Sequence, residues 1–417
     1  MYDKLISRAK LMGISLEIFS LKLKEYTISK EKFYVPENVE KIGYGIRVID
    51  DKSRMGYICM KKLDENTLEQ ALKISKLGEP DKANVLPQKQ PINKMSDYEV
   101  NPDVIKDVMI SLRELEENVN LTTISASAIN YEVSIFNTEG VEVREKRGVY
   151  LVQAVASKNT PEVYEILVSK DHKIPVNKLK ENLLEKIKIM ENRERLEGKR
   201  DVVFTQKALN ELLSTALPKL FSARSFHKGT TPFKLGEIIN EGLEIIDDPL
   251  DSSLPFSRSF DDEGNPSKVV NITDKGQVRS PLTNSYWSVK LSIENTSSAS
   301  RQLDSIVPSY TIPPSIGSSN IVIRHNNVES DIEDNSVVVD QLEGVNTIDY
   351  SSGDFSLIAN VSWLNEKGNK TGLKEVMITG NIKQLLKNLV SSSKDVENYG
   401  KIISGKLRVS DLSRVRP

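Results

Sequence analysis

The sequence has very little of the chemistry that metal sites and covalent catalysis use. Its 417 residues contain one cysteine, Cys59, and three histidines, His172, His227 and His325. A single cysteine excludes an internal disulfide and a cysteine-based metal cluster. No two histidines have the spacing of a helical zinc site, and no phosphate-binding glycine loop or Gly-x-Ser-x-Gly motif occurs. The chain therefore offers no familiar catalytic apparatus of its own.

The sequence also lacks an excess of charge of one sign and long apolar runs. Lys and Arg number 57 against 59 Asp and Glu, a formal net charge of −2, which gives no electrostatic reason to expect nucleic acid or an anionic membrane as a partner. No apolar run reaches the roughly 20 residues of a membrane helix. Charges among the first 17 residues leave no room for the apolar core of a signal peptide. We therefore predict a cytoplasmic protein that binds neither a membrane nor nucleic acid directly.

The pattern of elements predicts an α+β protein of more than one domain, because a single core rarely serves so long a chain. A proline-rich polar linker separates a first subdomain, residues 1–80, from a second, residues 103–193, each with antiparallel strands and helices. A cluster of charges then precedes a β-rich C-terminal domain, residues 197–417. Its short strands and polar turns predict a curved antiparallel sheet or partial barrel.

Local patterns predict the individual elements. A hairpin joins strands 43–49 and 55–60, and turns at 138–140 and at Arg147–Gly148 separate short strands of the second subdomain. The most regular helix is Gln206–Leu220, with a leucine-rich buried stripe. Further strands are expected at 122–128, 131–137, 141–146, 149–156, 285–294, 320–324, 336–342, 355–363 and 375–379, before a last helix at 382–390.

The stretch Ser257–Pro266 contains three consecutive carboxylates followed by a glycine that permits a positive-φ turn. Neighbouring like charges need either full solvation or donors aimed at them. One interpretation is an acidic surface turn. The other is a loop folded onto itself, with a nearby arginine, that holds its carboxylates toward a substrate or partner. The second predicts five binding residues: Arg258, Asp261, Asp262, Glu263 and Gly264.

Five segments, in this order, resemble TldD/PmbA (TldE) proteins, which have been called modulators of DNA gyrase and belong to a metalloprotease system. The resemblance covers the whole chain and is specific after Asp201. No single motif is decisive, but all five occur at plausible spacing. They are Leu209-Asn210-Glu211, Ser257 to Pro266, Lys290 to Thr296, Gly353-Asp354-Phe355-Ser356 and Ile378-Thr379-Gly380-Asn381.

TldD-like chains carry His-Glu-x-x-x-His on the first helix of the C-terminal domain and a cysteine near the end, which look like zinc ligands. The corresponding positions here hold Asn210, Glu211, Thr215 and Ser404. An amide and two hydroxyls bind zinc poorly. Only Glu211 is kept, as a vestigial catalytic candidate that the helix dipole explains equally well. The resemblance thus implies the PmbA/TldE kind of subunit, with no cofactor of its own and with zinc in a TldD-like partner.

The resemblance also suggests residues that line a groove. Asn284 and Ser285 stand where family members keep small polar residues. Gly353 and Asp354 resemble a PmbA-type segment, although a glycine turn at the start of a strand would explain them as well. The implied function is that of a non-catalytic subunit. Together with a TldD-like chain, or as a homodimer, it would enclose a chamber that degrades unfolded or short peptides.

Two other functions remain open on the sequence. A stand-alone hydrolase could use Mg²⁺ or Mn²⁺ held by Asp261, Asp262 and Glu263 or by Asp354, because hard cations prefer oxygen ligands. A non-enzymatic binding protein could instead act on a topoisomerase or a toxin–antitoxin pair, as the gyrase-modulator name suggests. The metal content of the purified chain separates the first from the subunit hypothesis, and co-purification separates the second.

Overall fold

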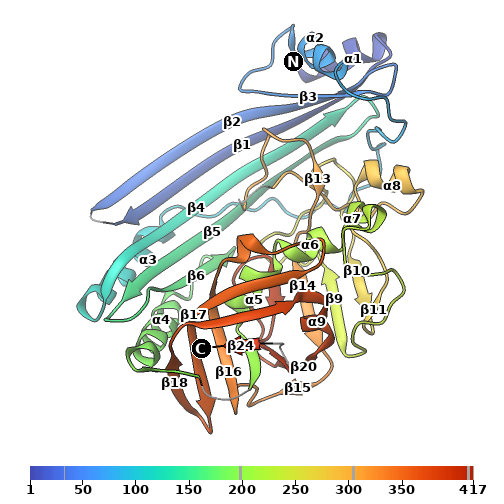
Figure 1. The fold of residues 1–417 in the computed structure, drawn as a ribbon. Coiled ribbons are helices and arrows are strands. Elements are labelled where there is room, and N and C mark those ends of the chain that lie inside the picture. The colour runs from blue at the N-terminus through green and yellow to red at the C-terminus, as the bar shows by residue number, and fades with distance from the viewer. Residues whose placement is uncertain (32, 197–199, 303–305, 411–413, 417) are drawn as a thin grey trace.

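The N-terminal half is built on one six-stranded antiparallel sheet, in the order β3-β2-β1-β4-β5-β6 (Figure 1). The computed structural model describes residues 1–31, 33–196, 200–302, 306–410 and 414–416. The predicted start of the C-terminal domain, at residue 197, lies outside the described residues. The strands are β1 Ser15–Lys30, β2 Tyr34–Ile49, β3 Met55–Met60, β4 Asn120–Asn137, β5 Glu142–Ser157 and β6 Val163–Ser169.

This sheet joins the two predicted N-terminal subdomains. Strand β1 comes from residues 1–80 and pairs with β4, from residues 103–193, in an unbroken register from Glu17–Asn137 to Lys30–Ile124. The proline-rich linker therefore connects two parts of one sheet and does not separate two folding units. The predicted hairpin between β2 and β3 is confirmed.

The strands are longer than the sequence predicted. The expected break at Arg147–Gly148 is wrong, since β5 runs through it and Gly148 pairs with Asn130 of β4. Gly148 instead allows another segment of backbone to pass close to β5, because a Cβ there would lie 2.7 Å from the backbone nitrogen of Val100. The linker crosses the sheet at this point, where the Asn130 side chain bonds both backbone groups of Val100. The turn at Gly140, with φ of 88°, is confirmed.

Two pairs of helices cover this sheet. Helices α1 (Tyr2–Leu11) and α2 (Thr67–Ser75) form a small core with β1 and β2 at one end (Figure 1). Helices α3 (Val104–Arg113) and α4 (Val176–Glu191), with the short 3-10 helix η1 (Glu114–Glu117), form a second core. This second core includes Trp363 from the C-terminal half, so the two halves share apolar packing.

The C-terminal half contains two main sheets around a common core. One has the order β11-β10-β9-β14-β22-β21, and the other β15-β20-β23-β8-β16-β17-β18-β7, with β19 and β24 paired beside β17. A small third sheet pairs β12 with β13. The bounds are β7 Arg193–Glu194, β8 Asp201–Phe204, β9 Leu243–Asp247, β10 Val270–Asp274, β11 Gln277–Val278, β12 Ala299–Ser300, β13 Ser315–Ile316, β14 Ile321–His325, β15 Val328–Glu329, β16 Ser336–Glu343, β17 Asp354–Glu366, β18 Asn369–Leu373, β19 Val376–Asn381, β20 Leu389–Ser393, β21 Glu397–Asn398, β22 Ile402–Ser404, β23 Leu407–Val409 and β24 Arg414–Arg416.

The α+β class is confirmed, but the predicted all-antiparallel sheet is not what forms. Strand β8 pairs with β16 in parallel, and β14 pairs with β22 in parallel. Within the part of the chain that the structure describes, neither sheet closes into a barrel. Helix α5 (Gln206–Leu213) contacts both sheets, through β16 and β22, and its leucine stripe fills the core between them.

Two predicted elements of this half are corrected. The helix expected over Gln206–Leu220 is divided at Ser214–Thr215 into α5 and α6 (Ala216–Leu220). The strand expected at 285–294 is helix α8 (Ser285–Leu291), because the Asn284 side chain accepts a hydrogen bond from the Trp287 backbone nitrogen and caps it. The remaining helices are α7 Ala223–Lys228, η2 Val345–Thr347 and α9 Ile382–Lys387.

A loop region of the C-terminal half covers the face of the N-terminal sheet. Phe256, Phe260 and Val307 pack against Phe19 of β1 and Tyr131 of β4 in a separate buried cluster. The stretch with three carboxylates lies within this contact. In the described residues, no helix combines the length and the apolar content that a membrane crossing needs.

Candidate functional site

Two of the positions that correspond to the zinc ligands of TldD-like chains, Asn210 and Ser404, lie on neighbouring elements. Asn210 stands on α5, and its side-chain oxygen accepts a hydrogen bond of 3.3 Å from the backbone nitrogen of Ile402 on β22. That strand ends at Ser404, which is fully buried and whose hydroxyl has no hydrogen-bond partner among the described residues. The structure therefore brings the helix and the C-terminal segment side by side, as the resemblance implies.

The side chains present do not fit zinc. The amide oxygen of Asn210 already binds a backbone N–H, and Thr215 is exposed at the start of α6. Neither hydroxyl is a good zinc ligand. Among the described residues, no three His, Cys, Asp or Glu side chains group as metal ligands. A zinc site at this position would need ligands that this chain lacks.

Glu211 is half-buried beside these positions, and its carboxyl accepts a 2.7 Å hydrogen bond from the Leu342 backbone nitrogen. Burial raises its pKa from the ordinary 4.5 to about 9, and the nearby negative charge of Asp340 adds to this rise. At neutral pH the carboxyl is therefore protonated. A protonated acid cannot accept a proton, so this environment does not favour Glu211 as a general base at neutral pH.

The cluster next to Glu211 is a balanced set of buried charges. Lys207 binds Asp340 at 2.7 Å and Glu165 at 3.1 Å, and Lys186 binds Asp340 at 2.8 Å. Both lysines lower the pKa of Asp340 against the opposing effect of burial. Two cations and two carboxylates compensate each other here, which leaves no cation to hold Glu211 ionised.

The three consecutive carboxylates of the Ser257–Pro266 stretch are buried inside this chain. Asp261 and Glu263 have no exposed surface, and Asp262 is 2% exposed. Glu263 binds Arg47 of β2 at 2.7 Å and also accepts the backbone N–H of Ser285 at 2.9 Å. They therefore do not line an open groove in this structure, and donors aimed at them from several elements satisfy them instead.

Arginines from both halves of the chain complete this network. Arg301 is fully buried, binds Glu17 of β1 at 2.6 Å and donates its backbone N–H to Asp262 at 2.6 Å. Glu17 also binds Arg47 at 2.5 Å. Arg258 lies 3.7 Å from Asp262 and donates to the Ala299 carbonyl. The network thus links the N-terminal sheet to the C-terminal loops through desolvated charges.

Asp261 holds the turn itself. Its Oδ1 accepts the backbone N–H groups of Glu263 and Asn265, at 3.0 and 2.9 Å. Burial, followed by the charge of Glu263, raises the pKa of Asp261. Gly264 has a φ of 90°, which confirms the predicted positive-φ turn, and a Cβ there would lie 2.7 Å from Val141. The loop is folded onto itself, as the sequence suggested, and acts as an internal brace.

The remaining predicted groove residues do not lie together in the structure. Gly353 has a φ of 82°, and exposed Asp354 accepts a 2.7 Å hydrogen bond from the Asn381 side chain, which also caps α9. These two residues therefore organise the turn before β17. Ser285 is buried and accepts a hydrogen bond from Asn265. The predicted metal set of Asp354 with the consecutive acids does not assemble among the described residues.

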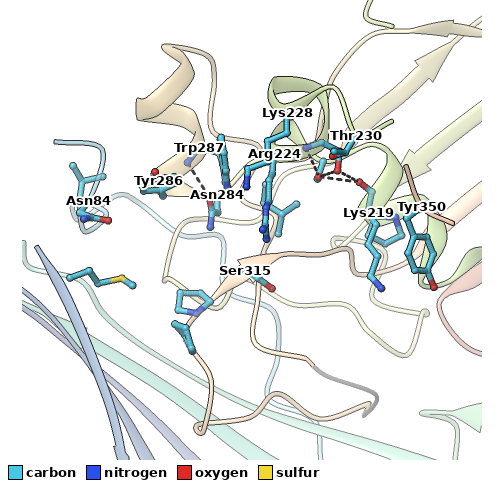
Figure 2. A pocket seen from close by; sticks show the side chains of 18 of the residues that line it. Asn84, Lys219, Arg224, Lys228, Thr230, Asn284, Tyr286, Trp287, Ser315 and Tyr350 are labelled. Carbon is cyan, nitrogen blue, oxygen red and sulfur yellow. Dashed lines mark hydrogen bonds between the residues drawn. The ribbon is translucent and has the colours of Figure 1, made fainter. Parts of the chain in front are cut away.

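Asn284 alone of the predicted residues lines a large cavity, of about 750 Å³. The cavity lies between the end of the N-terminal sheet and helices α6, α7 and α8 of the C-terminal half. Figure 2 shows residues of these helices along one side and Ser315 of β13 facing them. This volume is within the range of sites that take small ligands. It is the best-formed candidate binding site in the described structure.

Sequence reasoning missed the cations of this cavity. Lys219, Arg224 and Lys228 line it, whereas its lining contains no Asp or Glu. A signal was present, because the stretch from Leu212 to Gly236 has four cations and no acid. Aromatic residues lie beside them: Lys219 Nζ is 3.9 Å from the centre of the Tyr350 ring. The cavity is therefore a cationic pocket with apolar walls.

Comparison with known proteins agrees with this architecture. An uncharacterized protein of Methanocaldococcus jannaschii is 26% identical, over 96% of this chain and 97% of its own. A metalloprotease PmbA homolog of Buchnera aphidicola is 23% identical over 42% of this chain and 36% of its own. The crystal structure of TldE from Thermococcus kodakarensis has the same fold, with a TM-score of 0.86, 23% identity and 98% of each chain covered.

The family assignment rests on the C-terminal half. A family profile described as the PmbA/TldA metallopeptidase C-terminal domain matches residues 197–415, which is more than half of the chain. This match includes α5, with Asn210 and Glu211, the buried acids and the three helices that line the cationic cavity, but not its wall from residues 47–85. We conclude that this chain belongs to the PmbA/TldD family of metallopeptidase-like proteins.

Proposed function

We propose that this chain is a metal-free, non-catalytic subunit of a TldD/TldE-type metalloprotease that degrades unfolded or short peptides. One observation carries the proposal. At the positions that resemble zinc ligands, Asn210 binds the Ile402 backbone, Thr215 faces solvent and Ser404 is buried. Without a thiolate or imidazole, these groups cannot hold zinc tightly.

The protonation of Glu211 supports the same conclusion. A metallopeptidase of this kind needs a base for water, and a carboxyl with a pKa near 9 is protonated at neutral pH. The likeness in fold to TldE, the name printed for the Thermococcus structure, is compatible with a subunit role. We propose that a TldD-like chain supplies zinc to the assembly, and that a homodimer is the alternative arrangement.

The test is to purify the chain alone, and then to mix it with a TldD-like chain from the same genome. We expect no stoichiometric zinc by mass spectrometry and no chelator-sensitive peptide cleavage from the chain alone. The mixture should cleave peptides, and Glu211→Gln in this chain should leave that cleavage unchanged. One zinc per chain, together with cleavage by the isolated chain that a chelator abolishes, would refute the proposal.

A matched variant strengthens this test. The triple substitution Asn210→His, Thr215→His and Ser404→Cys supplies the missing ligand types without changing the rest of the chain. Zinc uptake by this variant, and none by the parent, would show that ligand identity alone explains the absence of metal. Equal and stoichiometric zinc in both proteins would show that metal binds elsewhere, and no zinc in either would show that ligand identity alone does not explain the absence of metal.

The gyrase-modulator name raises a non-enzymatic alternative. A protein of Thermotoga maritima that shares the fold, with a TM-score of 0.83, 21% identity and 98% of this chain covered, was described as a proposed modulator of a DNA gyrase. No nucleic-acid surface of this chain supports that role over a peptide-binding one, given the formal net charge of −2. Co-purification with gyrase, and not with a peptidase subunit, would favour it.

A further inference from the structure

The cationic cavity carries charges that the rest of the chain does not neutralise. Of the four cations that line it, Arg47 is compensated by Glu17 and Glu263. Lys219, Arg224 and Lys228 form no ion pair with any described residue. The ammonium group of Lys219 lies 3.9 Å from the centre of the Tyr350 ring. Three positive charges therefore face one cavity with no carboxylate in its lining.

The cavity wall also contains an amide donor that is free to bind a ligand. Asn284 is 5% exposed, and its side-chain oxygen accepts the Trp287 N–H, so its orientation is fixed. The NH₂ group at the other end of this amide is not among the buried atoms and makes no hydrogen bond to the described residues. Figure 2 shows Asn284 on the cavity wall, on the same side as Arg224. An accessible N–H donor beside three cations suits an oxygen anion.

Apolar side chains line part of the cavity, beside neutral polar ones such as Ser222, Thr230 and Ser315. Pro313 and Pro314 lead into β13, and Ile49 and Met55 come from the N-terminal sheet. Trp287, whose ring lies 5.6 Å from that of His227, stands on α8. A ligand that fits must therefore combine an anionic group with an apolar portion. A peptide whose carboxylate lies next to apolar residues has both.

We propose that this cavity binds peptides through a carboxylate, with Arg224, Lys228 and Lys219 as its counter-charges and Asn284 as a hydrogen-bond donor. A cavity of one sign concentrates ligands of the opposite sign, because its walls exclude water and focus the field. This inference rests on the proposed function only in taking a peptide as the ligand. The carboxylate belongs either to the C-terminus of the peptide or to an acidic side chain.

Calorimetric titration of the full chain with three unlabelled hexapeptides tests the proposal. All three share apolar residues: one has a free C-terminus, one a C-terminal amide, and one an amide with an internal Asp. We expect the free acid to bind at least tenfold more tightly than the neutral amide. The Asp peptide tells the two sources of the carboxylate apart, because it binds like the free acid only if a side chain suffices.

The matched variants are Arg224→Glu with Lys228→Glu, and Lys234→Glu as a control. All three side chains are exposed and lie in the same acid-free stretch, but Lys234 does not line the cavity. The double variant should lose at least tenfold in affinity for the carboxylate peptide and little for the neutral amide. The control should stay within twofold. Circular dichroism checks that each variant is folded.

The outcomes separate this inference from the proposed function. Equal binding of the free acid and the neutral amide would overturn the inference and leave a peptide-binding subunit intact, as would a double variant that binds like the parent chain. No binding of any of the three peptides would overturn the inference and also remove peptide binding by this chain from the proposed function. Zinc-dependent cleavage by the isolated chain would overturn the proposed function alone.

Discussion

Removal of the Glu263 side chain tests whether the consecutive acids are an internal brace. The substitution Glu263→Ala leaves Arg47 with Glu17 as its one remaining carboxylate, and leaves the Ser285 N–H without its acceptor. Breaking a buried ion pair by removing one partner typically costs about 3–5 kcal/mol. An unsatisfied buried N–H accounts for roughly 1–3 kcal/mol of such a loss.

The assay is thermal unfolding of the isolated chain, followed by circular dichroism. For a chain of 417 residues the unfolding entropy gives roughly 1 °C per kcal/mol, so the midpoint should fall by about 3–6 °C. The control is Glu294→Ala, which removes an acid that is 77% exposed and paired with Lys268; exposed pairs contribute about 0–1 kcal/mol. A midpoint within 1 °C of the parent for Glu263→Ala would show that this ion pair does not brace the fold.

Three further variants probe other parts of the argument. Because burial raises the pKa of Glu211 from 4.5 to about 9, its carboxyl ionises on unfolding, so the parent chain loses stability as pH rises through this window. Glu211→Gln should therefore be more stable by about 1–3 kcal/mol at pH 8 and equal at pH 4, in urea melts; a constant difference would contradict this. Leu213→Ala, at a fully buried position, should lose about 2–5 kcal/mol in the same melts, and a loss below 1 kcal/mol would place it outside the core. Gly264→Val forces a positive φ and a contact with Val141, so we expect a loss above about 2 kcal/mol by thermal unfolding. The control Gly368→Val shares the positive φ, 82°, but its Cβ meets nothing within 4 Å, so it should lose less, and equal losses would show that the Val141 contact costs nothing.

The sequence predicted the class and most elements of the fold, but divided long strands. Strand β5 was split at Gly148 because glycine is typical of turns, whereas here it admits the backbone of Val100 from a segment 48 residues earlier. Helix α8 was predicted as a strand because its aromatic and β-branched residues favour one. The helix begins at the cap formed by one side chain, that of Asn284. Such contacts cannot be derived from periodicity.

The sequence also predicted only the local part of the site and not its long-range contacts. The turn at Gly264 follows from local chemistry and was foreseen. The partners of its acids were not, since Glu263 and Arg47 are separated by 216 residues and Glu17 and Arg301 by 284. The cationic cavity was missed because its residues come from six separate segments. Only the acid-free stretch of α6 and α7 gave a local signal.

The charged network has a consequence for synthesis of the chain. Arg301 leaves the ribosome long after Glu17, so the N-terminal sheet is complete while Glu17 has only Arg47 of β2 as a counter-charge. Until then Phe19 and Tyr131 lack their cover of Phe256 and Phe260, and the sheet presents an apolar face while translation continues. At about 5–20 residues per second this interval lasts several seconds. During synthesis the nascent N-terminal half is therefore a stage at which this protein is exposed to aggregation.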